Sequence, residues 1–283
     1  VNELQIPRMF FINMLDREHA KFENALESIK EAYGNNATTF QIPVNQGEGF
    51  NAVIDLLRMK KLTFNADKSG KFTAEDIPAD LADRAEELRM ELIEKIAECD
   101  DDIMEKYLDT MELSDEDLVS GLRSGMVDMK IFPIFCGAAS ANVGPSSLLE
   151  FICQYGPSPA ARTNYIAKDQ DDNDVQIVCD ENADFSGFAF KTIAEMHVGE
   201  LSLIRVYSGS LKSGDEVVNA SRKFNEKIGQ IYALNGKTRT EVSVLHAGDI
   251  GALVKLKNTH TSDTLANKKR VVKFPKIKLA EPV

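Results

Sequence analysis

The chain has 283 residues, of which 43% are apolar and 28% are charged, values typical of a soluble globular protein of about two domains. No apolar run reaches the ~18 residues of a membrane-spanning helix. The first residues also lack the basic flank and apolar stretch of a signal peptide, so we expect a cytoplasmic protein with no membrane partner. The chain begins with Val1 in what reads as the middle of an element, so we expect a piece of a longer protein.

The net charge of −12 is divided unevenly along the chain. Residues 1–158 hold 15 Lys and Arg against 29 Asp and Glu, whereas residues 159–283 hold 18 against 16. An acidic half repels phosphate backbones, so any nucleic-acid contact is expected in the second half. The four cysteines include no CxxC pair, which excludes a zinc knuckle and favours reduced thiols.

Apolar patterning in the first half predicts alternating strands and helices, the mark of an α/β fold. Short apolar runs predict buried strands at 9–12 and 131–135, and strand-like alternation occupies 40–78. Helices are expected at 22–33 and 147–155, and one long acidic helix is expected from Leu81 to Ile103. Ser114 and Asp117 resemble a capping box that would begin another helix.

The pattern changes after the proline-rich linker at 156–159. Beyond it, no helical stripe lasts two turns. Short alternating segments predict strands instead, separated by turn signals such as Asn235-Gly236, and they lie at 188–191, 201–207, 216–219, 227–232 and 250–254. Short, evenly spaced strands in a unit of this size favour a small closed barrel.

Several tempting motifs favour ordinary turns. Gly236-Lys237-Thr238 imitates the end of a phosphate-binding loop, but it lacks the first glycine and the following helix, so we predict a hairpin turn. Residues 169–180 place Asp169, Asp171, Asn173 and Asp180 as in a calcium loop, without the required glycine, which predicts a solvated loop. The histidines are scattered and suggest no catalytic group: His19, His197, His246 and His260.

Two polar turns follow the predicted strands at 9–12 and 131–135. Asn13-Met14-Leu15-Asp16 follows the first, and Cys136-Gly137-Ala138-Ala139 follows the second. If the strands are adjacent and parallel, both turns lie at the sheet edge where open α/β sheets bind ligands. The pair is similar to the NKxD and SAx motifs of GTP-binding domains, in which the aspartate accepts from guanine N1 and N2 and a backbone amide donates to O6.

The surrounding sequence resembles bacterial elongation factor G. Residues 6–18 resemble the segment around NKxD in that family, and residues 50–59 resemble the start of the insert in its G domain. Further similar segments, collinear over essentially the whole chain, lie at 77–80, 104–108, 188–191, 205–209, 214–217 and 247–250.

This resemblance implies a partial P-loop-type G domain of the α/β class with an inserted α+β subdomain, followed by an all-β translation-factor barrel. It implies that residues 1–158 are the C-terminal part of the G domain, with the insert at about 41–130, and that residues 159–283 are the β-barrel domain II. The implied guanine-binding residues are Asn13, Asp16, Ala138 and Ala139, with Met14 in the place of the usual lysine.

The resemblance also implies a parent protein that binds GTP or GDP with Mg²⁺ and acts on the ribosome as a monomer. Its activity would be tRNA–mRNA translocation or ribosome recycling. Domain II would contact small-subunit rRNA, with Lys268, Lys269 and Arg270 as candidate phosphate contacts, although a solvated tail is an equal alternative. The acidic insert would meet the ribosomal stalk proteins.

Three residues depart from the family pattern. Met14 loses the ammonium group that would reach the phosphate loop, Ala138 stands where serine is usual, and Ser262 stands where glycine is usual. These changes favour a divergent elongation factor G-like protein.

The sequence contains no phosphate loop, no switch threonine and no DxxG followed by histidine, and phosphoryl transfer depends on phosphate cradling and metal positioning. We therefore expect no catalytic residue, no metal ligand and no bound nucleotide in this chain, which would be inactive alone. Two alternatives remain open. One is a ribosomal protection protein of the tetracycline-resistance type, and the other is a nucleotide-free ribosome- or partner-binding interaction protein whose acidic insert binds a partner.

Overall fold

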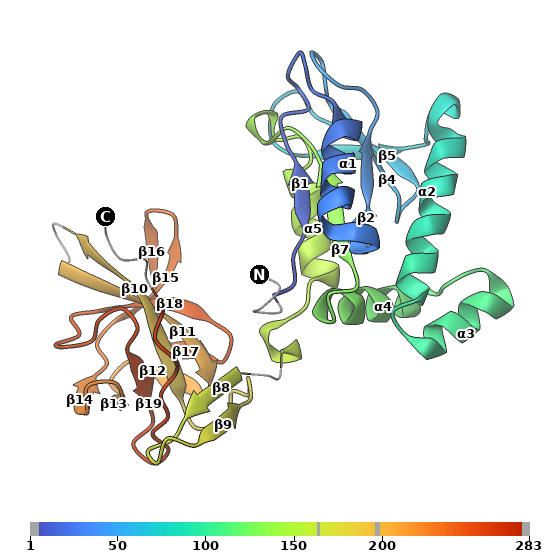
Figure 1. The fold of residues 1–283 in the computed structure, drawn as a ribbon. Helices are drawn as coiled ribbons and strands as arrows, with labels where there is room; N and C mark the ends of the chain where they lie inside the picture. The colour runs from blue at the N-terminus through green and yellow to red at the C-terminus, as the bar shows by residue number, and fades with distance from the viewer. Residues whose placement is uncertain (1–5, 163–164, 196–198, 279–283) are drawn as a thin grey trace. The chain divides into compact units, whose positions relative to one another are not determined.

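The computed structural model describes residues 6–162, 165–195 and 199–278, and the chain divides into two compact units, Val1–Pro157 and Ser158–Val283 (Figure 1). His197 lies outside the described residues. Within the described ranges, no helix is long and apolar enough to cross a membrane.

The first unit is built on a three-stranded parallel sheet in the order β1 (Phe10–Ile12), β7 (Phe132–Cys136) and β2 (Ala37–Thr39). The helices α1 (Phe22–Tyr33) and α5 (Pro145–Tyr155) pack against this sheet (Figure 1). Side chains alternate along a strand, so Phe132, which meets a ring of α1, and Phe135, which meets a ring of α5, point to opposite faces. The sheet is therefore covered on both faces, which explains the apolar sequences of β1 and β7.

Three phenylalanine rings form the centre of the core on the α5 side. Phe135 lies 4.8 Å from Phe151 and 5.7 Å from Phe40, and Phe40 lies 5.2 Å from Phe151, measured between ring centroids. All three are buried. Each such aromatic pair adds about 0.5–1.5 kcal/mol beyond the burial of its apolar area, so this cluster fixes α5 against β7.

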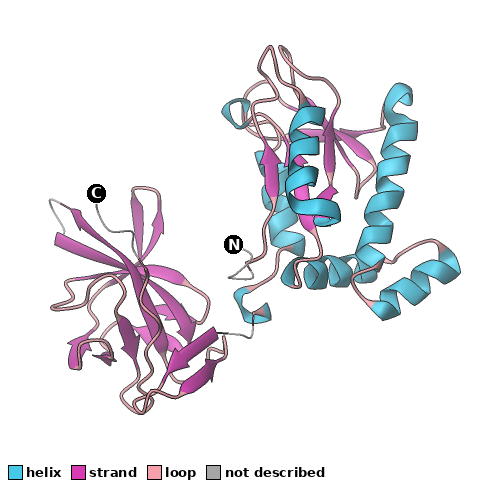
Figure 2. Cartoon of the chain, viewed as in Figure 1, coloured by secondary structure: helices cyan, strands magenta, loops and turns pink. Residues whose placement is uncertain are grey.

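Residues 41–75 form a four-stranded antiparallel sheet, as the strand-like alternation predicted. Its strands are ordered as in the sequence: β3 (Gln41–Pro43), β4 (Ala52–Asp55), β5 (Lys60–Phe64) and β6 (Phe72–Glu75). The helices α2 (Ala79–Ala97), α3 (Asp101–Thr110) and α4 (Asp115–Val127) follow (Figure 2).

The prediction of one long helix from Leu81 to Ile103 is wrong. Residues 98–100 interrupt the helix, and the Asp100 carboxylate accepts hydrogen bonds from the backbone N–H groups of Asp102 and Ile103. This cap starts α3 in a new direction. The apolar stripe conceals the break, because Ile96 and Ile103 are both buried on either side of it. The predicted cap at Ser114 is confirmed, since its hydroxyl accepts from the Asp117 N–H at 3.1 Å.

The second unit is almost entirely antiparallel β-structure. Eight strands form one sheet in the order β14 (Phe224–Lys227), β13 (Glu216–Asn219), β19 (Thr264–Ala266), β10 (Ser186–Glu195), β11 (Gly199–Ser208), β18 (Ile250–Val254), β15 (Ile231–Asn235) and β16 (Thr238–Val242). Two further pairs are β12 (Ser210–Lys212) with β17 (Val244–His246) and β8 (Tyr165–Lys168) with β9 (Asp174–Ile177). This sheet fits the expected barrel.

Local turns in this unit agree with the sequence in most places. Asn235 and Thr238 pair across the β15–β16 hairpin, and Gly236 has φ 58°. The segment Gly236-Lys237-Thr238, which resembles the end of a phosphate-binding loop, is therefore a hairpin turn as predicted. The Asp169 carboxylate accepts from the N–H groups of Asp171 and Asn173, so the calcium-like segment closes on itself. The predicted strand at 227–232 is two strands, because β14 ends at Lys227 and β15 begins at Ile231.

Ser262 explains why glycine is usual at its position in the family that the sequence resembles. Its φ is 74°, in the left-handed region, where a Cβ atom is unfavourable. The residue is nearly buried, its N–H donates to Ala189 O at 2.7 Å, and its hydroxyl accepts from Ile277 N at 3.2 Å. The hydroxyl bond therefore partly offsets the backbone strain.

Two substitutions at this position separate the strain from the hydrogen bond. Both Ser262→Ala and Ser262→Gly remove the bond to Ile277, but only glycine relieves the left-handed backbone. We expect the glycine variant to be more stable than the alanine variant by about 1 kcal/mol in urea unfolding. Equal free energies of unfolding for the two variants would show that the backbone is not strained there.

The four thiols should differ sharply in reactivity. Cys153 is exposed, whereas Cys99 and Cys136 are buried, and burial raises the pKa of Cys99 to about 11 and that of Cys136 further. Because the thiolate is the reactive form, we expect a disulfide reagent at pH 8 to label Cys153 roughly a hundredfold faster than either buried thiol. Mass spectrometry of timed samples measures this order, with the partly exposed Cys179 expected between Cys153 and the two buried thiols. Fast labelling of Cys136 would contradict the described packing of β7.

Candidate guanine-recognition site

The parallel pairing of β1 and β7 brings the two predicted turns together. Ile12 lies opposite Cys136, and the pairing continues past both strand ends. The Gly137 N–H donates to Ile12 O at 3.0 Å, and the Leu15 N–H donates to Gly137 O at 3.2 Å. The two segments, more than a hundred residues apart in the sequence, therefore leave the sheet side by side at its carboxyl edge.

Direct hydrogen bonds join the two turns beyond that edge. The Asn13 Oδ1 accepts from the Ala139 N–H at 2.9 Å, and the Ser140 hydroxyl lies 3.4 Å from the Asp16 Oδ2. Asn13, Asp16 and Ala139 are thus brought together as the sequence predicts. Ser140-Ala141 is an alternative register for the SA pair in the sequence, and the structure adds the contact of Ser140 with Asp16.

Asp16 carries an unused acceptor. Its Oδ1 is buried and has no hydrogen-bond partner within the described ranges. A buried carboxylate oxygen without a donor is unfavourable by about 1–3 kcal/mol or more, because it has lost water and gained nothing in return. The side chain therefore has acceptor capacity that no described residue uses.

Ala138 and Ala139 have different surroundings. Ala138 is buried, and its N–H donates to Val143 O at 2.9 Å while its carbonyl accepts from Val143 N at 3.1 Å. Ala139 is exposed and its N–H is held by Asn13. Of the two residues, only Ala139 is exposed, so its amide is the one that a ligand can approach.

Met14 lies at the exposed surface of the first turn. It has φ 63° and is 58% exposed, in a turn that is closed by a bond from Arg17 N to Met14 O at 3.1 Å. An unbranched side chain at this position can lie along a base, as a lysine stem would, but supplies no positive charge.

The loop after β7 is closely packed and contacts a neighbouring turn. A Cβ atom on Gly137 would lie 2.3 Å from Val143 O, and one on Gly144, whose φ is 98°, would lie 2.7 Å from Cys136 O. The β5–β6 turn also contacts the loop, since Asn142 Nδ2 donates to Lys68 O at 3.0 Å and the Ser146 hydroxyl donates to Gly70 O at 2.5 Å. No sequence signal indicated this support.

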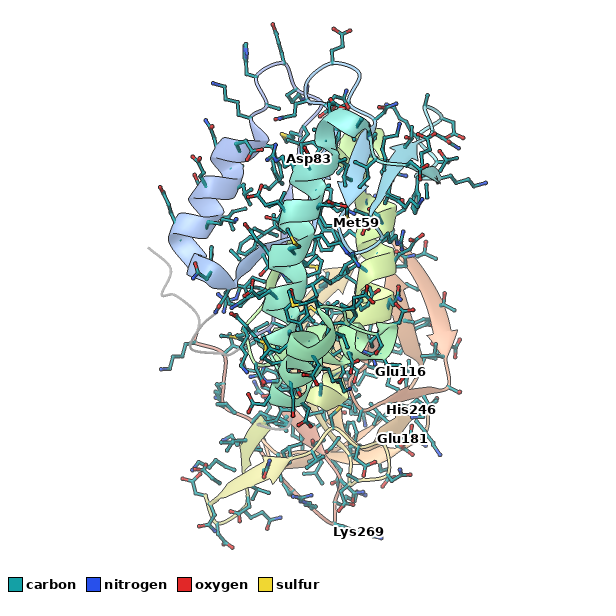
Figure 3. The ribbon with its side chains drawn as sticks, turned by 90° about the vertical axis from the view of Figure 1, so that its right-hand side faces the viewer. Met59, Asp83, Glu116, Glu181, His246 and Lys269 are labelled. Carbon is teal, nitrogen blue, oxygen red and sulfur yellow. The ribbon has the colours of Figure 1, made fainter. Side chains whose placement is uncertain are left out.

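The three basic residues proposed for rRNA contact lie in the loop after β19. Lys268 forms an ion pair with Glu216 at 2.6 Å, and the Lys269 N–H donates to Asn267 Oδ1 at 2.9 Å. The side chains of Lys269 and Arg270 are exposed, and Figure 3 shows Lys269 pointing away from the ribbon. Two of the three charges are therefore available to a ligand.

Comparison with known proteins agrees with these observations. Residues 184–268 match the sequence model of elongation factor G domain 2. A crystal structure of a protein from Thermus thermophilus matches 94% of this chain with a TM-score of 0.78 and 23% sequence identity. Within residues 184–268 the resemblance to elongation factor G is supported by the family model, and the structural match shows a shared fold. This chain spans 37% of the length of the Thermus protein, and that match extends the shared fold over both units.

The bond from Ala139 to Asn13 leads to a prediction for the free protein. In Asn13→Ala the Ala139 N–H loses its acceptor, so we expect its hydrogen exchange, measured by NMR, to accelerate roughly fivefold, as expected for a bond of about 1 kcal/mol. Met14→Ala is the matched control, because the neighbouring Met14 side chain is exposed and no contact of it with Ala139 is described. Unchanged exchange in Asn13→Ala would show that this bond does not hold the loop.

Proposed function

We propose that this chain is the base-reading and ribosome-facing part of an elongation factor G-like translational GTPase. The whole protein would bind GTP or GDP with Mg²⁺ and drive tRNA–mRNA movement or ribosome recycling in the cytoplasm. The observation that carries the proposal is the juxtaposition of Asn13 and Asp16 with the Ala139 amide, in a chain whose second unit matches elongation factor G domain 2.

The chemistry of the site favours guanine over adenine. The free Oδ1 of Asp16 and its neighbour Oδ2 form an acceptor edge, which suits the N1–H and N2–H donors of guanine. Adenine presents a lone pair at N1 and no amino group at C2, so it would leave the Asp16 Oδ1 unpaired at about 1–3 kcal/mol. Met14 lowers affinity without affecting this choice.

The domain II assignment supports contact with small-subunit rRNA. The exposed Lys269 and Arg270 are the candidate phosphate contacts, while Lys268 is partly neutralised by Glu216. The acidic helices α2 to α4 remain candidates for the stalk contact. We propose a monomeric protein for both roles.

A second candidate function has its own observation. The Ala139 N–H, expected to donate to guanine O6, is already bonded to Asn13. Together with Met14 in the place of lysine, this arrangement is what a nucleotide-free, ribosome- or partner-binding protein would retain as a relic.

Exchanging one acceptor of Asp16 for a donor tests the base-reading role. In Asp16→Asn the side-chain oxygen can still accept from N1–H, but the side-chain amide now donates toward the C2 substituent of the base. Guanine carries an amino group at C2, whereas xanthine carries a carbonyl there. We expect GDP to bind about tenfold more weakly and xanthosine diphosphate more tightly, measured by calorimetry or ligand-observed NMR. Glu18→Gln removes a nearby exposed charge and serves as the control.

The outcomes separate the two candidate functions. An unchanged base preference in Asp16→Asn would favour the nucleotide-free protein. We expect Met14→Lys to strengthen GDP binding only slightly, since the charge lacks a phosphate loop to reach. The native chain should hydrolyse no GTP, and sustained turnover by it would refute the proposal that catalysis requires other segments.

A further inference from the structure

A fully buried glutamine links the antiparallel sheet β3–β6 to the first turn of α5. Gln41 is 0% exposed and begins β3, between two buried apolar residues, Phe40 and Ile42. Its Nε2 donates to the Ser147 Oγ at 3.1 Å. A polar side chain that is wholly removed from water is unfavourable unless its hydrogen bonds are replaced, so these bonds determine what this position can do.

Ser147 connects Gln41 to the loop after β7. Its hydroxyl, which accepts from Gln41, donates to Gly144 O at 2.9 Å. Gly144 ends this loop and is closely packed, because a Cβ atom on it would lie 2.7 Å from Cys136 O. A change at the Ser147 hydroxyl therefore acts directly on the end of the loop.

The end of the loop determines where the Ala139 amide lies. Val143, which precedes Gly144, exchanges two backbone hydrogen bonds with Ala138, at 2.9 and 3.1 Å. Ala138 is followed by Ala139, whose N–H donates to Asn13 in the candidate guanine-recognition site. The buried glutamine thus reaches this amide through one side-chain hydroxyl and a short, closed segment of backbone.

The Gln41 amide is only partly satisfied. Its Oε1 is buried and has no hydrogen-bond partner among the described residues. Asp55 on β4 lies directly opposite Gln41 in the β3–β4 pairing, where opposed side chains share one face of the sheet, and it is also buried. A protonated Asp55 carries an O–H group, which is the donor that Oε1 lacks.

Burial makes Asp55 easier to protonate than an exposed aspartate. It raises the pKa of Asp55, and the interactions with Arg58 and Gln41 lower that pKa only in part. The ionised carboxylate accepts at Oδ1 from the N–H groups of Leu57 and Arg58, at 3.1 and 3.0 Å. Further titratable groups near Asp55 are its cross-strand neighbour Lys60, which pairs with Asp76, then Tyr155 and Glu150 on α5, of which Glu150 pairs with Arg58, and Arg89 on α2, which donates to Leu56 O and Leu57 O.

We propose that Gln41 is a positioning residue for the loop after β7, and that protonation of Asp55 switches its hydrogen bonds. With Asp55 ionised, Nε2 donates to Ser147, and the Ser147 hydroxyl is held toward Gly144. Uptake of one proton from water gives Asp55 an O–H group that donates to Oε1, and the turning of the amide toward this donor withdraws Nε2 from Ser147. The loop, and with it the Ala139 amide, is then held less firmly. This switch regulates the candidate guanine-recognition site and therefore rests on the proposed function.

Hydrogen exchange of the Ala139 amide in the free chain, measured by NMR across a pH series, tests the switch. The rate at each pH is divided by that of an unfolded peptide, so that only protection by structure remains. We expect protection to fall about threefold as the pH is lowered and Asp55 takes up its proton, as for the partial loss of one hydrogen bond. The carboxyl carbon signal of Asp55 follows its titration. Asp55→Asn, which has no acid to titrate, should show no pH dependence at Ala139.

Gln41→Met separates positioning from a general effect on stability. The variant keeps the length of the side chain but neither polar group, so we expect about threefold less protection of Ala139 at high pH and no pH dependence, while Asp55 still titrates. Ser147→Ala breaks the same connection and should give the same result. Thr39→Val is the matched control, because it removes a buried hydroxyl two residues away that has no partner in the described ranges, and it should change neither quantity.

The proposal is overturned if Asp55 stays ionised over the whole pH range in which the chain is folded, or if protection of Ala139 does not change as Asp55 titrates. It is also overturned if the pH dependence persists in either Gln41→Met or Ser147→Ala, because Asp55 would then act on the loop by another route. Thermal melts verify that each variant is folded. Every measurement is made without nucleotide, so a failure of base recognition in Asp16→Asn would leave these results unchanged, and the two failures are distinguishable.

Discussion

The backbone pairing of β1 with β7 is the interaction on which the candidate site depends. It aligns Ile12 with Cys136 and continues through Gly137 to Leu15, so that two turns distant in sequence share one edge. A shift of one residue would exchange the faces of every side chain in a strand. The rings of α1 and α5 on opposite faces of the sheet resist such a shift, because each face buries its own aromatic side chains.

Patterns that arise within one short segment were predictable from the sequence. The apolar runs that became β1 and β7, the helix ending at Gly34 and the hairpin at Asn235-Gly236 all follow from local chemistry. The break between α2 and α3 was not recognised, since an apolar stripe reports which face is buried and not whether the axis is continuous. Asp100 carried the signal, as an N-cap residue within an otherwise acidic stretch.

The features of the site that could not be predicted from the sequence arise from contacts between distant segments. The support of the loop by Lys68 and Gly70 depends on how the β5–β6 turn is placed, and no local pattern encodes this. The close approach at Gly137 belongs to the same class, because its cause is the carbonyl of Val143. Asn13, Asp16 and Ala139 were found because their two turns resemble the NKxD and SAx motifs of GTP-binding domains, and this resemblance supplied the long-range pairing.

The hydrogen bonds of the free site clarify how the proposed selectivity would arise. At Ala139, arrival of guanine would exchange one acceptor, Asn13 Oδ1, for another, the base O6, so the number of bonds is conserved and little free energy is gained there. Asp16 differs, because its Oδ1 begins without a partner among the described residues. The gain on binding would therefore come from the acidic side chain, and adenine, which has no donors for it, would gain nothing at that position. Discrimination between the bases then rests on Asp16, while Asn13 closes the loop when no base is present.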